Sequence, residues 1–535
     1  MLRAAAVIGP ELDIELLAAL LGRPAVDLLD DAELAAAKQL LAEADGVFRF
    51  RHELVMQALA ASATVSRAAL LHRQAGRVLA RQPYADPALV AHHARLGGDV
   101  ELASRSLRIA AERAAERFDH AAAEALLDDA LRLHPDPGGW LERARVRTLR
   151  RRYHEALDDV ERAAAAGPAA LEVGAWACYF DRRFAQAAQF AADGALAAAD
   201  AASRSRCLAV GGRTRHAAGD LAQAELLLGE AFSLADGTDR VTAAAWLGVL
   251  RAHQSRTDEA LALLRPAARA TEGVAHTAAT LHALLFTGHA HAVAGHPALA
   301  LDAFTRYTAE AERRQVPRFT GRAVNFAGWV LRNLGAADQA HDRHLQALEL
   351  GLRGAGIPEL TIAALEDLAE QCVEAGDPDC AQARLAEARA VLTGDLVFGW
   401  RLDLKHHLVS GRLALLRGDA ALALATASAL ETRAAALGVP RYLSVARVLK
   451  HRAHRALSLP VDLAAVAADL ELVEGSVAVE AWWWTGETAA DLAVPAWLDL
   501  AADRAERLAR QAGDHADVLR RAAAQRLDRW RARAG

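Results

Sequence analysis

The sequence contains no run of about 18 apolar residues, the length that a membrane-spanning helix requires. Lysine is rare, and Lys38, Lys405 and Lys450 each follow an apolar residue, so none completes a G-x-x-x-x-G-K loop that cradles phosphates. No G-x-S-x-G, H-E-x-x-H, strand-associated G-x-G-x-x-G or calcium-binding loop occurs either. We therefore expect a protein without catalytic residues, without a cofactor and without ATP hydrolysis of its own.

Cysteines and export signals are also scarce. The four cysteines, Cys178, Cys207, Cys372 and Cys380, form no C-x-x-C pair and are too few for a disulfide framework or a zinc knuckle. A short apolar run near the N-terminus is followed by acidic residues and lacks a signal-peptide cleavage context. These features predict a reducing, cytoplasmic setting.

Neither aromatic residues nor positive charge is abundant. Phe, Trp and Tyr make up 5% of the 535 residues, whereas alanine is frequent, and this composition favours helices over sheets. The formal net charge of −6 leaves the chain as a whole without the basic field that nucleic-acid binding normally needs. The composition predicts an all-α protein that binds neither nucleic acid nor a membrane directly.

The sequence does contain a repeated pair of small residues, twelve positions apart. Two helices that cross closely need a small residue on each at the crossing. The pairs are Ala91/Ala103, Ala111/Ala123, Ala144/Ala156, Ala175/Ala187, Gly212/Ala224, Gly248/Ala260, Gly288/Ala300, Gly328/Ala340, Ala369/Ala381 and Gly411/Ala423. A turn-forming glycine often stands five residues before the second member, and a large apolar residue often stands four residues after it. The pattern predicts about ten helical hairpins.

These hairpins resemble the tetratricopeptide repeat, as in AGDLAQAELLLGEA (residues 218–231) and GHPALALDAF (residues 295–304). The resemblance covers about residues 85–435 and implies an α-solenoid of tetratricopeptide-like (TPR-like) hairpins over that range. Atypical hairpins and capping helices are expected over residues 436–535. The aromatic pair usual on the first helix of the repeat is mostly absent, and the hairpins lengthen toward the C-terminus.

Residues 1–62 do not follow the repeat. Two short helical patterns, over Glu11–Leu21 and Pro24–Leu41, precede the turn dipeptide Asp45-Gly46. The alternation in Val47–Phe50 then has the period of a strand. Helices followed by a small hairpin predict a winged-helix-like domain here, and we expect a connecting helix between this domain and the repeats, over residues 63–84.

Segments of this region resemble a known family of regulators. LRAAAVIG, FRFRHELVMQAL, LLHRQAGRVLA and ALVAHHARLGGD are similar to the region that follows the nucleotide-binding domain in signal-transduction ATPases with numerous domains (STAND), including the large LuxR-family regulators. The resemblance implies that the winged helix is an internal regulatory element. It also implies that His52 senses the nucleotide state when an NTPase domain is present; the alternative is that His52 caps a helix or packs on the wing.

Two features usual in that family are missing. The chain has no nucleotide-binding loop, and its tail lacks the LTxRExEVL-like helix-turn-helix of LuxR proteins. Either the native protein begins further upstream, which we favour, or its ATPase module was lost or resides elsewhere. We expect a non-catalytic TPR sensor or scaffold module that binds a protein or small effector within a STAND or LuxR-type transcriptional or signalling regulator. The alternative is a stand-alone TPR adaptor that mediates protein–protein interactions.

Three further clusters were considered as sites. Six arginines within residues 143–152 could bind phosphate, but nearby carboxylates favour a balanced, solvated helix face. Three consecutive tryptophans, Trp482–Trp484, cannot all face one core from a helix, so at least one should be exposed or cover a neighbour. His341 and His344 could present two metal ligands, but no third ligand is evident, and we expect no metal.

A partner is expected in the concave groove that the first helices of such repeats line. The predicted lining residues, taken around the small residue of each first helix, are Trp176, Tyr179, Arg213, His253, His289, Arg322, Asn325, Trp329, Arg332, Asn333, Lys405 and Arg412. This set is richer in aromatic, amide and cationic groups than the Ala/Leu background. It favours an acidic peptide segment or a small anionic effector; the alternative is an ordinary wet inner surface.

Overall fold

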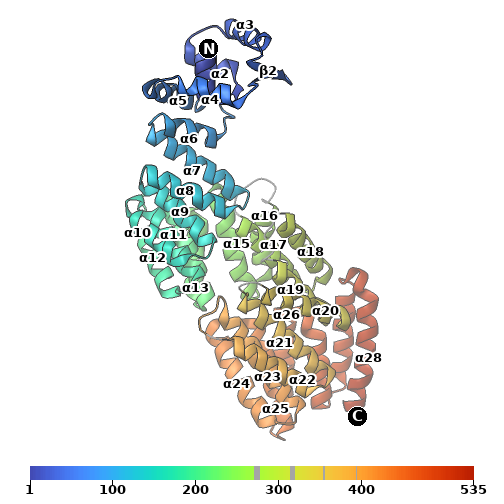
Figure 1. Cartoon of the computed structure of the whole chain (residues 1–535). Coiled ribbons are helices and arrows are strands. Elements are labelled where there is room, and N and C mark those ends of the chain that lie inside the picture. Colours follow the sequence, from blue (N-terminus) through green and yellow to red (C-terminus); the bar gives the residue numbers. More distant parts are fainter. Residues whose placement is uncertain (270–276, 314–319, 354–355, 393, 535) are drawn as a thin grey trace. The chain divides into compact units, whose positions relative to one another are not determined.

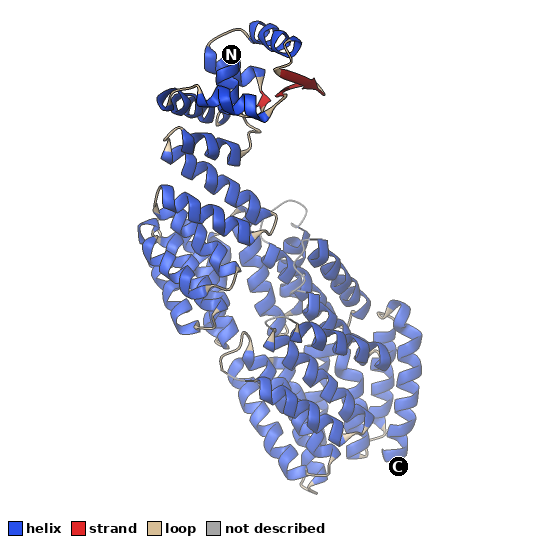
Figure 2. Cartoon of the chain, viewed as in Figure 1, coloured by secondary structure: helices blue, strands red, loops and turns tan. Residues whose placement is uncertain are grey.

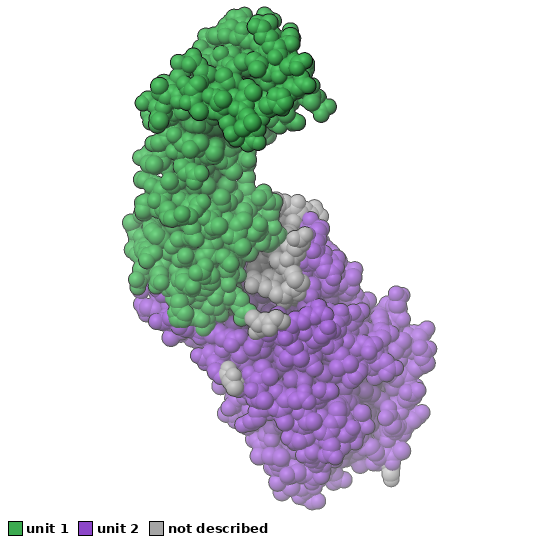
Figure 3. Space-filling model, viewed as in Figure 1, with its two compact units in different colours: residues 1–181 green, residues 182–535 purple. Residues whose placement is uncertain are grey.

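The structure is a computed structural model that describes residues 1–269, 277–313, 320–353, 356–392 and 394–534. The chain divides into two compact units, unit 1 (Met1–Asp181) and unit 2 (Arg182–Gly535), which are coloured separately in Figure 3. Within the described ranges both units are helical, and the strands lie in the first 50 residues (Figure 2). The fold is all-α, as the sequence predicted.

Unit 1 contains eleven α-helices. They are α1 (Leu2–Ile8), α2 (Ile14–Leu21), α3 (Ala25–Ala37), α4 (Glu53–Ala61), α5 (Val65–Leu79), α6 (Pro87–Leu96), α7 (Val100–Glu116), α8 (His120–Leu133), α9 (Pro137–Leu149), α10 (Tyr153–Arg162) and α11 (Pro168–Phe180). From α6 onward, consecutive helices pack against each other as hairpins (Figure 1).

The first part of unit 1 holds a three-stranded antiparallel sheet in the order β1-β3-β2. Strands β2 (Leu41–Ala44) and β3 (Val47–Phe50) form a hairpin around Asp45 and Gly46, which both have positive φ, and β1 (Glu11–Leu12) pairs with β3. The helices here are shorter than the sequence patterns suggested. Asp13 caps α2 by accepting a hydrogen bond from the Leu16 N–H, so Glu11 and Leu12 are released to the sheet. The winged-helix assignment stays a prediction.

Unit 2 is built from longer helices. They are α12 (Phe184–Ala197), α13 (Ala201–Ala218), α14 (Leu221–Leu234), α15 (Gly237–His253), α16 (Thr257–Arg269), α17 (Thr277–Val293), α18 (Pro297–Arg313), α19 (Thr320–Asn333), α20 (Ala337–Leu352), α21 (Pro358–Ala375), α22 (Pro378–Val391), α23 (Gly399–Leu416), α24 (Ala420–Leu437), α25 (Pro440–Ala456), α26 (Leu463–Leu492), α27 (Ala496–Ala509) and α28 (Ala516–Ala534). Successive helices again stack as antiparallel hairpins, which makes the array an α-solenoid (Figure 1).

The small residues of the repeat mark the helix crossings. All ten second-helix alanines, from Ala103 to Ala423, are 0% exposed. A Cβ added to Gly212 would lie 2.6 Å from Leu228 Cγ, and one added to Gly288 would lie 2.5 Å from Phe304 Cε1. The large residue four positions after the alanine therefore packs directly on the glycine of the first helix, and at these two crossings there is no room for a Cβ.

The turns of several hairpins share a glycine-aspartate pair. Gly219 and Gly376 end α13 and α21 in the left-handed conformation, and the following Asp220 and Asp377 each accept a hydrogen bond from a backbone N–H in the first turn of the next helix. The α21–α22 turn also brings Cys372 and Cys380 together, with Cα atoms 5.8 Å apart, and the structure joins them by a disulfide that sequence spacing did not suggest.

The tryptophan triplet corrects an expectation. We expected one indole to be exposed or to cover a neighbour, but Trp482, Trp483 and Trp484 are 1%, 2% and 0% exposed. Their helix, α26, deviates from helical geometry at Val477 and packs against α17, α19, α25, α27 and α28, so it is enclosed on several sides. A helix surrounded in this way has no face that must be polar.

Among the described residues, no single helix is long and apolar enough to cross a membrane. One bent pair, α4 with α5, meets the length and composition criteria only when its two halves are taken together, at 110° to each other.

Candidate functional site

The predicted lining residues lie on first helices of the hairpins, but most are enclosed. Ten of the twelve are buried, while Trp176 and Arg322 are partly exposed. Trp176 and Tyr179 lie on α11 in unit 1, where their rings contact each other at 5.5 Å. The other ten lie in unit 2, on α13, α15, α17, α19 and α23.

Helix α26 occupies part of the space that these side chains border. Trp329 Nε1 on α19 donates a hydrogen bond to Glu480 Oε1 over 2.7 Å. Trp482 Nε1 donates to the backbone oxygen of Asn333 over 3.0 Å, and Trp483 Nε1 donates to Asn333 Oδ1 over 3.0 Å. The polar groups of Trp329 and Asn333 are thus committed to their own chain.

Three of the predicted cations are committed as well. Arg332, Lys405 and Arg412 all form ion pairs with Glu370, and Arg332 lies 2.6 Å from Glu374. These groups hold the pKa values of both carboxyls below their usual range, even though burial acts in the opposite direction. The cluster joins α19, α21 and α23 and leaves no guanidinium or ammonium group of these three residues for an external ligand.

Of the twelve predicted lining residues, Arg322 and Asn325 border an open space. A hollow with a cavity volume of about 170 Å³ lies between α19, α21 and the start of α23. Its lining residues are Arg322, Asn325, Phe326, Ile357, Glu359, Leu360, Ala363, Val397, Phe398, Arg401 and Leu402. We call this space the arginine hollow.

Both cations of the arginine hollow lack a carboxylate partner in the described part of the chain. Among the described residues no Asp or Glu oxygen lies within 4.0 Å of the guanidinium of Arg322 or Arg401. The one carboxylate in the lining, Glu359, is taken by Arg182 at 3.2 Å and by the Val397 N–H at 3.1 Å. Asn325 is also occupied, because its Nδ2 donates to Asp367 Oδ2 over 2.8 Å.

Burial is the main influence on the charge of Arg401. Burial, together with the nearby Arg322 and Arg441, lowers the pKa of Arg401 to about 10, although Tyr442 and Asp367 oppose this shift. The guanidinium still carries its charge at neutral pH. An anion placed beside it would supply the interaction that the chain itself does not.

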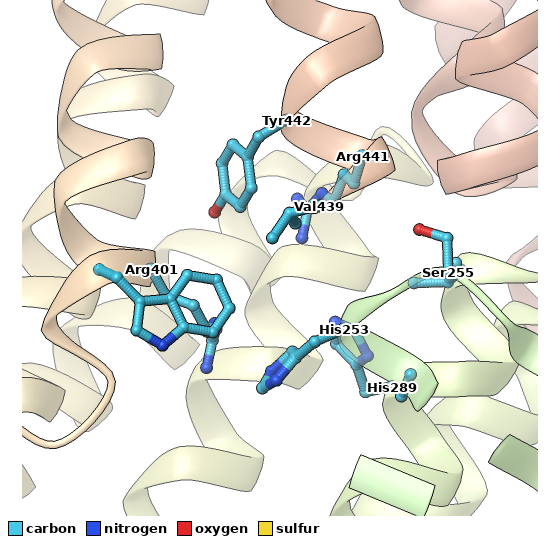
Figure 4. A pocket seen from close by; sticks show the side chains of 10 residues that line it. His253, Ser255, His289, Arg401, Val439, Arg441 and Tyr442 are labelled. Atoms are coloured by element: carbon cyan, nitrogen blue, oxygen red, sulfur yellow. The ribbon is translucent and has the colours of Figure 1, made fainter. Parts of the chain in front are cut away.

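A second, smaller hollow shares Arg401 as part of its wall. It is lined by Ala252, His253, Ser255, His289, Val293, Trp400, Arg401, Val439, Arg441 and Tyr442. Figure 4 shows the side chains of His253, His289 and Arg401 turned toward this space from three different helices. Burial and the nearby Arg401 lower the pKa values of His253 and His289 well below 6.5, so both rings are neutral at pH 7.

A short segment positions Arg401 between the two hollows. Before α23 begins, the chain turns at Phe398, whose N–H donates to the Ala217 oxygen over 3.1 Å. Trp400 Nε1 then donates to the His216 oxygen over 3.0 Å. These bonds tie the start of α23 to the end of α13, and they fix Arg401 in the first turn of α23.

The remaining candidate residues lie elsewhere. Arg213 stacks on the rings of Trp246 and Phe398 at 4.3 and 4.5 Å.

His52 is the exposed residue before α4 and makes no capping hydrogen bond through its side chain. His344 is buried and contacts Asn325 Oδ1 at 3.0 Å, while His341 is exposed, and no group of described residues has three potential metal ligands.

The arginine cluster in unit 1 also differs in part from expectation. Arg143 is 8% exposed and binds Asp159 through two hydrogen bonds of 2.8 and 2.9 Å, while Arg147 binds both Asp159 and Glu124. Asp159 and Glu124 are themselves 0% and 2% exposed. Arg143 and Arg147 thus belong to a buried network between α8, α9 and α10, whereas Arg145, Arg150 and Arg151 are exposed, as expected of a solvated face.

Arg401, Arg441 and Phe398 were missed by sequence reasoning. On α23 the predicted lining extends from Arg412 back to Lys405, and Arg401 lies one helical turn before that point. Arg401 and Phe398 lie at the start of the helix, where only the three-dimensional approach of α13 gives them a common environment. The sequence signal that was available is the cluster F-G-W-R at residues 398–401.

No protein-family model and no curated protein sequence matches the chain. Solved structures of other proteins are similar to this chain at low identity. They include a Rap protein complexed with competence and sporulation factor, at a TM-score of 0.46 and 11% identity, covering 72% of this chain and 99% of that one. Another is a STAND protein with a tetratricopeptide repeat sensor from Pyrococcus horikoshii, at a TM-score of 0.37 and 13% identity, covering 81% of this chain.

This chain spans 62% of that STAND chain, less than two thirds of its length. A third neighbour is the APC/C hetero-tetramer Cut9-Hcn1, at a TM-score of 0.29 and 13% identity, covering 78% of this chain and 96% of that one.

Proposed function

We propose that this chain is a non-catalytic sensor or scaffold module whose unit 2 binds a protein segment or a small effector. The observation that carries the proposal is the arginine hollow, in which Arg322 and Arg401 border apolar walls without a carboxylate partner among the described residues. Arg322 and Arg401 are partly buried, whereas the buried cations Arg332 and Arg412 are paired with carboxylates. We propose that a bound anion pairs with Arg322 and Arg401 in place of a carboxylate of the chain.

The biological context we propose is a STAND or LuxR-type transcriptional or signalling regulator in the cytoplasm. In it, residues 1–62 act as a winged-helix-like regulatory element, residues 63–84 as a connecting helix, and residues 85–435 with the capping residues 436–535 receive the signal. His52 senses the nucleotide state only if an NTPase domain works with this chain. The alternative is a stand-alone TPR adaptor that bridges proteins.

The ligand-binding proposal is tested with the full chain and a charge-reversed variant. Immobilised wild-type protein and the Arg322→Glu/Arg401→Glu variant are exposed to a cell extract, and retained proteins and small molecules are identified by mass spectrometry. We expect a defined species to be retained by the wild type and lost from the variant. Arg332 is not used, because reversing its charge would break the ion pairs to Glu370 and Glu374.

A matched control separates the site from general charge. Arg313→Glu/Arg353→Glu reverses two exposed arginines, which pair only within their own helices, and should retain the species as the wild type does. Circular dichroism melting curves check that each variant is folded. Equal retention by the wild type and the Arg322→Glu/Arg401→Glu variant would reject the proposal.

The regulator and the adaptor differ in their genetic context. An in-frame G-x-x-x-x-G-K loop upstream of residue 1 in the genome supports the regulator, because that loop forms the phosphate cradle this chain lacks. A stop codon and a ribosome-binding site immediately before Met1 support the adaptor.

A further inference from the structure

The arginine hollow is apolar apart from one region. Its apolar lining residues are Phe326, Ile357, Leu360, Ala363, Val397, Phe398 and Leu402. Glu359 Oε1 is already used by Arg182 and the Val397 N–H, and both polar atoms of Asn325 are used by Asp367 and His344. A ligand with several hydroxyl groups would therefore find few partners here and would lose its hydration without compensation.

The exception is the end of the hollow formed by Arg322 and Arg401. Guanidinium groups match the geometry of a carboxylate or phosphate, and the resulting charge-assisted hydrogen bonds are stronger than neutral ones. A free phosphate would satisfy the cations but leave the apolar walls in contact with water. An acid group on an apolar body satisfies both parts of the site at once.

We infer that the arginine hollow binds a ligand made of one carboxylate and a compact apolar group, with the carboxylate on Arg322 and Arg401 and the apolar group against Phe326, Leu360 and Leu402. The inference rests on the proposed function, because it names the ligand class of the same site. The hollow has a cavity volume of about 170 Å³, below the range of about 300–1,000 Å³ typical of drug-sized ligands, so its ligand must be compact.

Two sources can present this chemistry. One is a free aliphatic or aromatic carboxylic acid. The other is the C-terminal end of a peptide whose last side chain is apolar. The contacts at the arginines are the same in both cases, so the experiment includes an arm for each.

The test measures binding to the purified full chain by isothermal titration calorimetry. The probes are 4-phenylbutyrate, its neutral amide 4-phenylbutanamide, inorganic phosphate, and a tetrapeptide ending in phenylalanine with either a free or an amidated C-terminus. We expect the free acid, the free-carboxylate peptide, or both to bind at least tenfold more tightly than the matching amide. Inorganic phosphate should neither bind with similar affinity nor displace the acid.

Two variants locate the binding. Arg401→Gln removes the charge and should weaken the acid at least tenfold while leaving the weak binding of the amide unchanged. Ala363→Leu keeps both arginines but fills the apolar part of the hollow, so it should weaken acid and amide alike. Arg353→Gln, an exposed arginine on the same unit, should change neither, and melting curves confirm that all three variants are folded.

The outcomes separate this inference from the proposed function. Equal binding of acid and amide, insensitivity to Arg401→Gln, or no binding of any carboxylate overturns the inference. If Arg322→Glu/Arg401→Glu still abolishes retention of a species from extract in that case, the site stands and its ligand belongs to another class. Tighter binding of the free acid than of the peptide assigns the source to a small molecule, and the reverse assigns it to a peptide end.

Discussion

Trp483 Nε1 donates a hydrogen bond to Asn333 Oδ1 over 3.0 Å, although 150 residues separate the two in the sequence. Asn333 Nδ2 in turn donates to the backbone oxygen of Trp329 over 2.9 Å. One buried amide thus links α26 to the inner helix α19. The C-terminal part of unit 2 therefore packs against helices in the middle of the array, as well as against the last hairpin.

Replacing this amide should destabilise the fold. Asn333→Ala leaves the Trp483 indole N–H buried without an acceptor, and an unpaired buried donor costs about 1–3 kcal/mol. Urea unfolding of the variant should show a lower free energy of unfolding by that amount. Gln339→Ala, an exposed change on the following helix, should shift the free energy by less than about 0.5 kcal/mol. Equal effects of the two changes would show that the amide link contributes nothing.

The buried acidic centre of unit 2 should respond far more strongly than a surface pair. Glu370 is 2% exposed and neutralises Arg332, Lys405 and Arg412, so Glu370→Gln leaves three buried cations short of one anion. Breaking a buried pair in this way costs about 3–5 kcal/mol. Glu349→Gln removes an exposed i,i+4 pair with Arg353 and should cost less than about 0.5 kcal/mol. Chemical unfolding of both variants under the same conditions provides the comparison.

The hairpin array could be predicted because its cause is local and repeated. Small residues such as Gly212 and Gly288 recur at a fixed distance from the side chains that pack on them, and that distance is visible along the chain. The α26 helix could not be placed in the same way. Its contacts with α19 join residues about 150 positions apart, and an Ala-rich pattern contains no signal for such pairings.

The candidate site, like the fold, could be predicted from the sequence only in part. Helical spacing correctly put Arg322 and Arg332 on one inner helix, α19, but it could not tell a free guanidinium from a paired one. The difference depends on which carboxylates the neighbouring helices supply: Glu370 and Glu374 reach Arg332, while Glu359 near Arg322 is engaged by Arg182. Pairing is a tertiary property, and it decides which arginine can bind a ligand.

Acid should weaken the contact between α26 and the C-terminal helix. Arg452, the Trp530 indole N–H and Arg533 outweigh the effect of burial and lower the pKa of Glu487 to about 2. Since an unfolded glutamate titrates near 4.5, this stabilisation is present above pH 4.5 and is lost as the pH falls from 4.5 toward 2. A shift of this size corresponds to at most about 3 kcal/mol.

The measurement is urea unfolding at pH 7, 4 and 3 for the wild type and Glu487→Gln. The variant should be less stable at pH 7, and the difference from the wild type should shrink as the pH is lowered, because protonation makes the two side chains alike. A difference that stays constant across this range would contradict the assignment.

Two arginines on the wall of the smaller hollow should have opposite effects on stability. Arg441 pairs with Glu480 over 2.6 Å, so Arg441→Met leaves that carboxylate buried and should lower the free energy of unfolding by about 3–5 kcal/mol. Arg401 has no carboxylate partner among the described residues, and the nearby Tyr442 and Asp367 and the Phe326 ring, 5.7 Å away, offset only part of the cost of burying its charge. Arg401→Met should therefore raise the free energy of unfolding of the ligand-free chain by about 1 kcal/mol.

The sign of the Arg401 effect distinguishes a binding residue from a structural one. Thermal melts of the wild type, Arg401→Met and Arg441→Met, each with and without 4-phenylbutyrate, give the comparison directly. If Arg401 is kept for a ligand, the acid should raise the melting temperature of the wild type, while Arg401→Met should melt higher than the wild type without ligand and respond less to it. A lower melting temperature for ligand-free Arg401→Met would mean that this guanidinium stabilises the fold, and the reason for assigning it to a ligand would be gone.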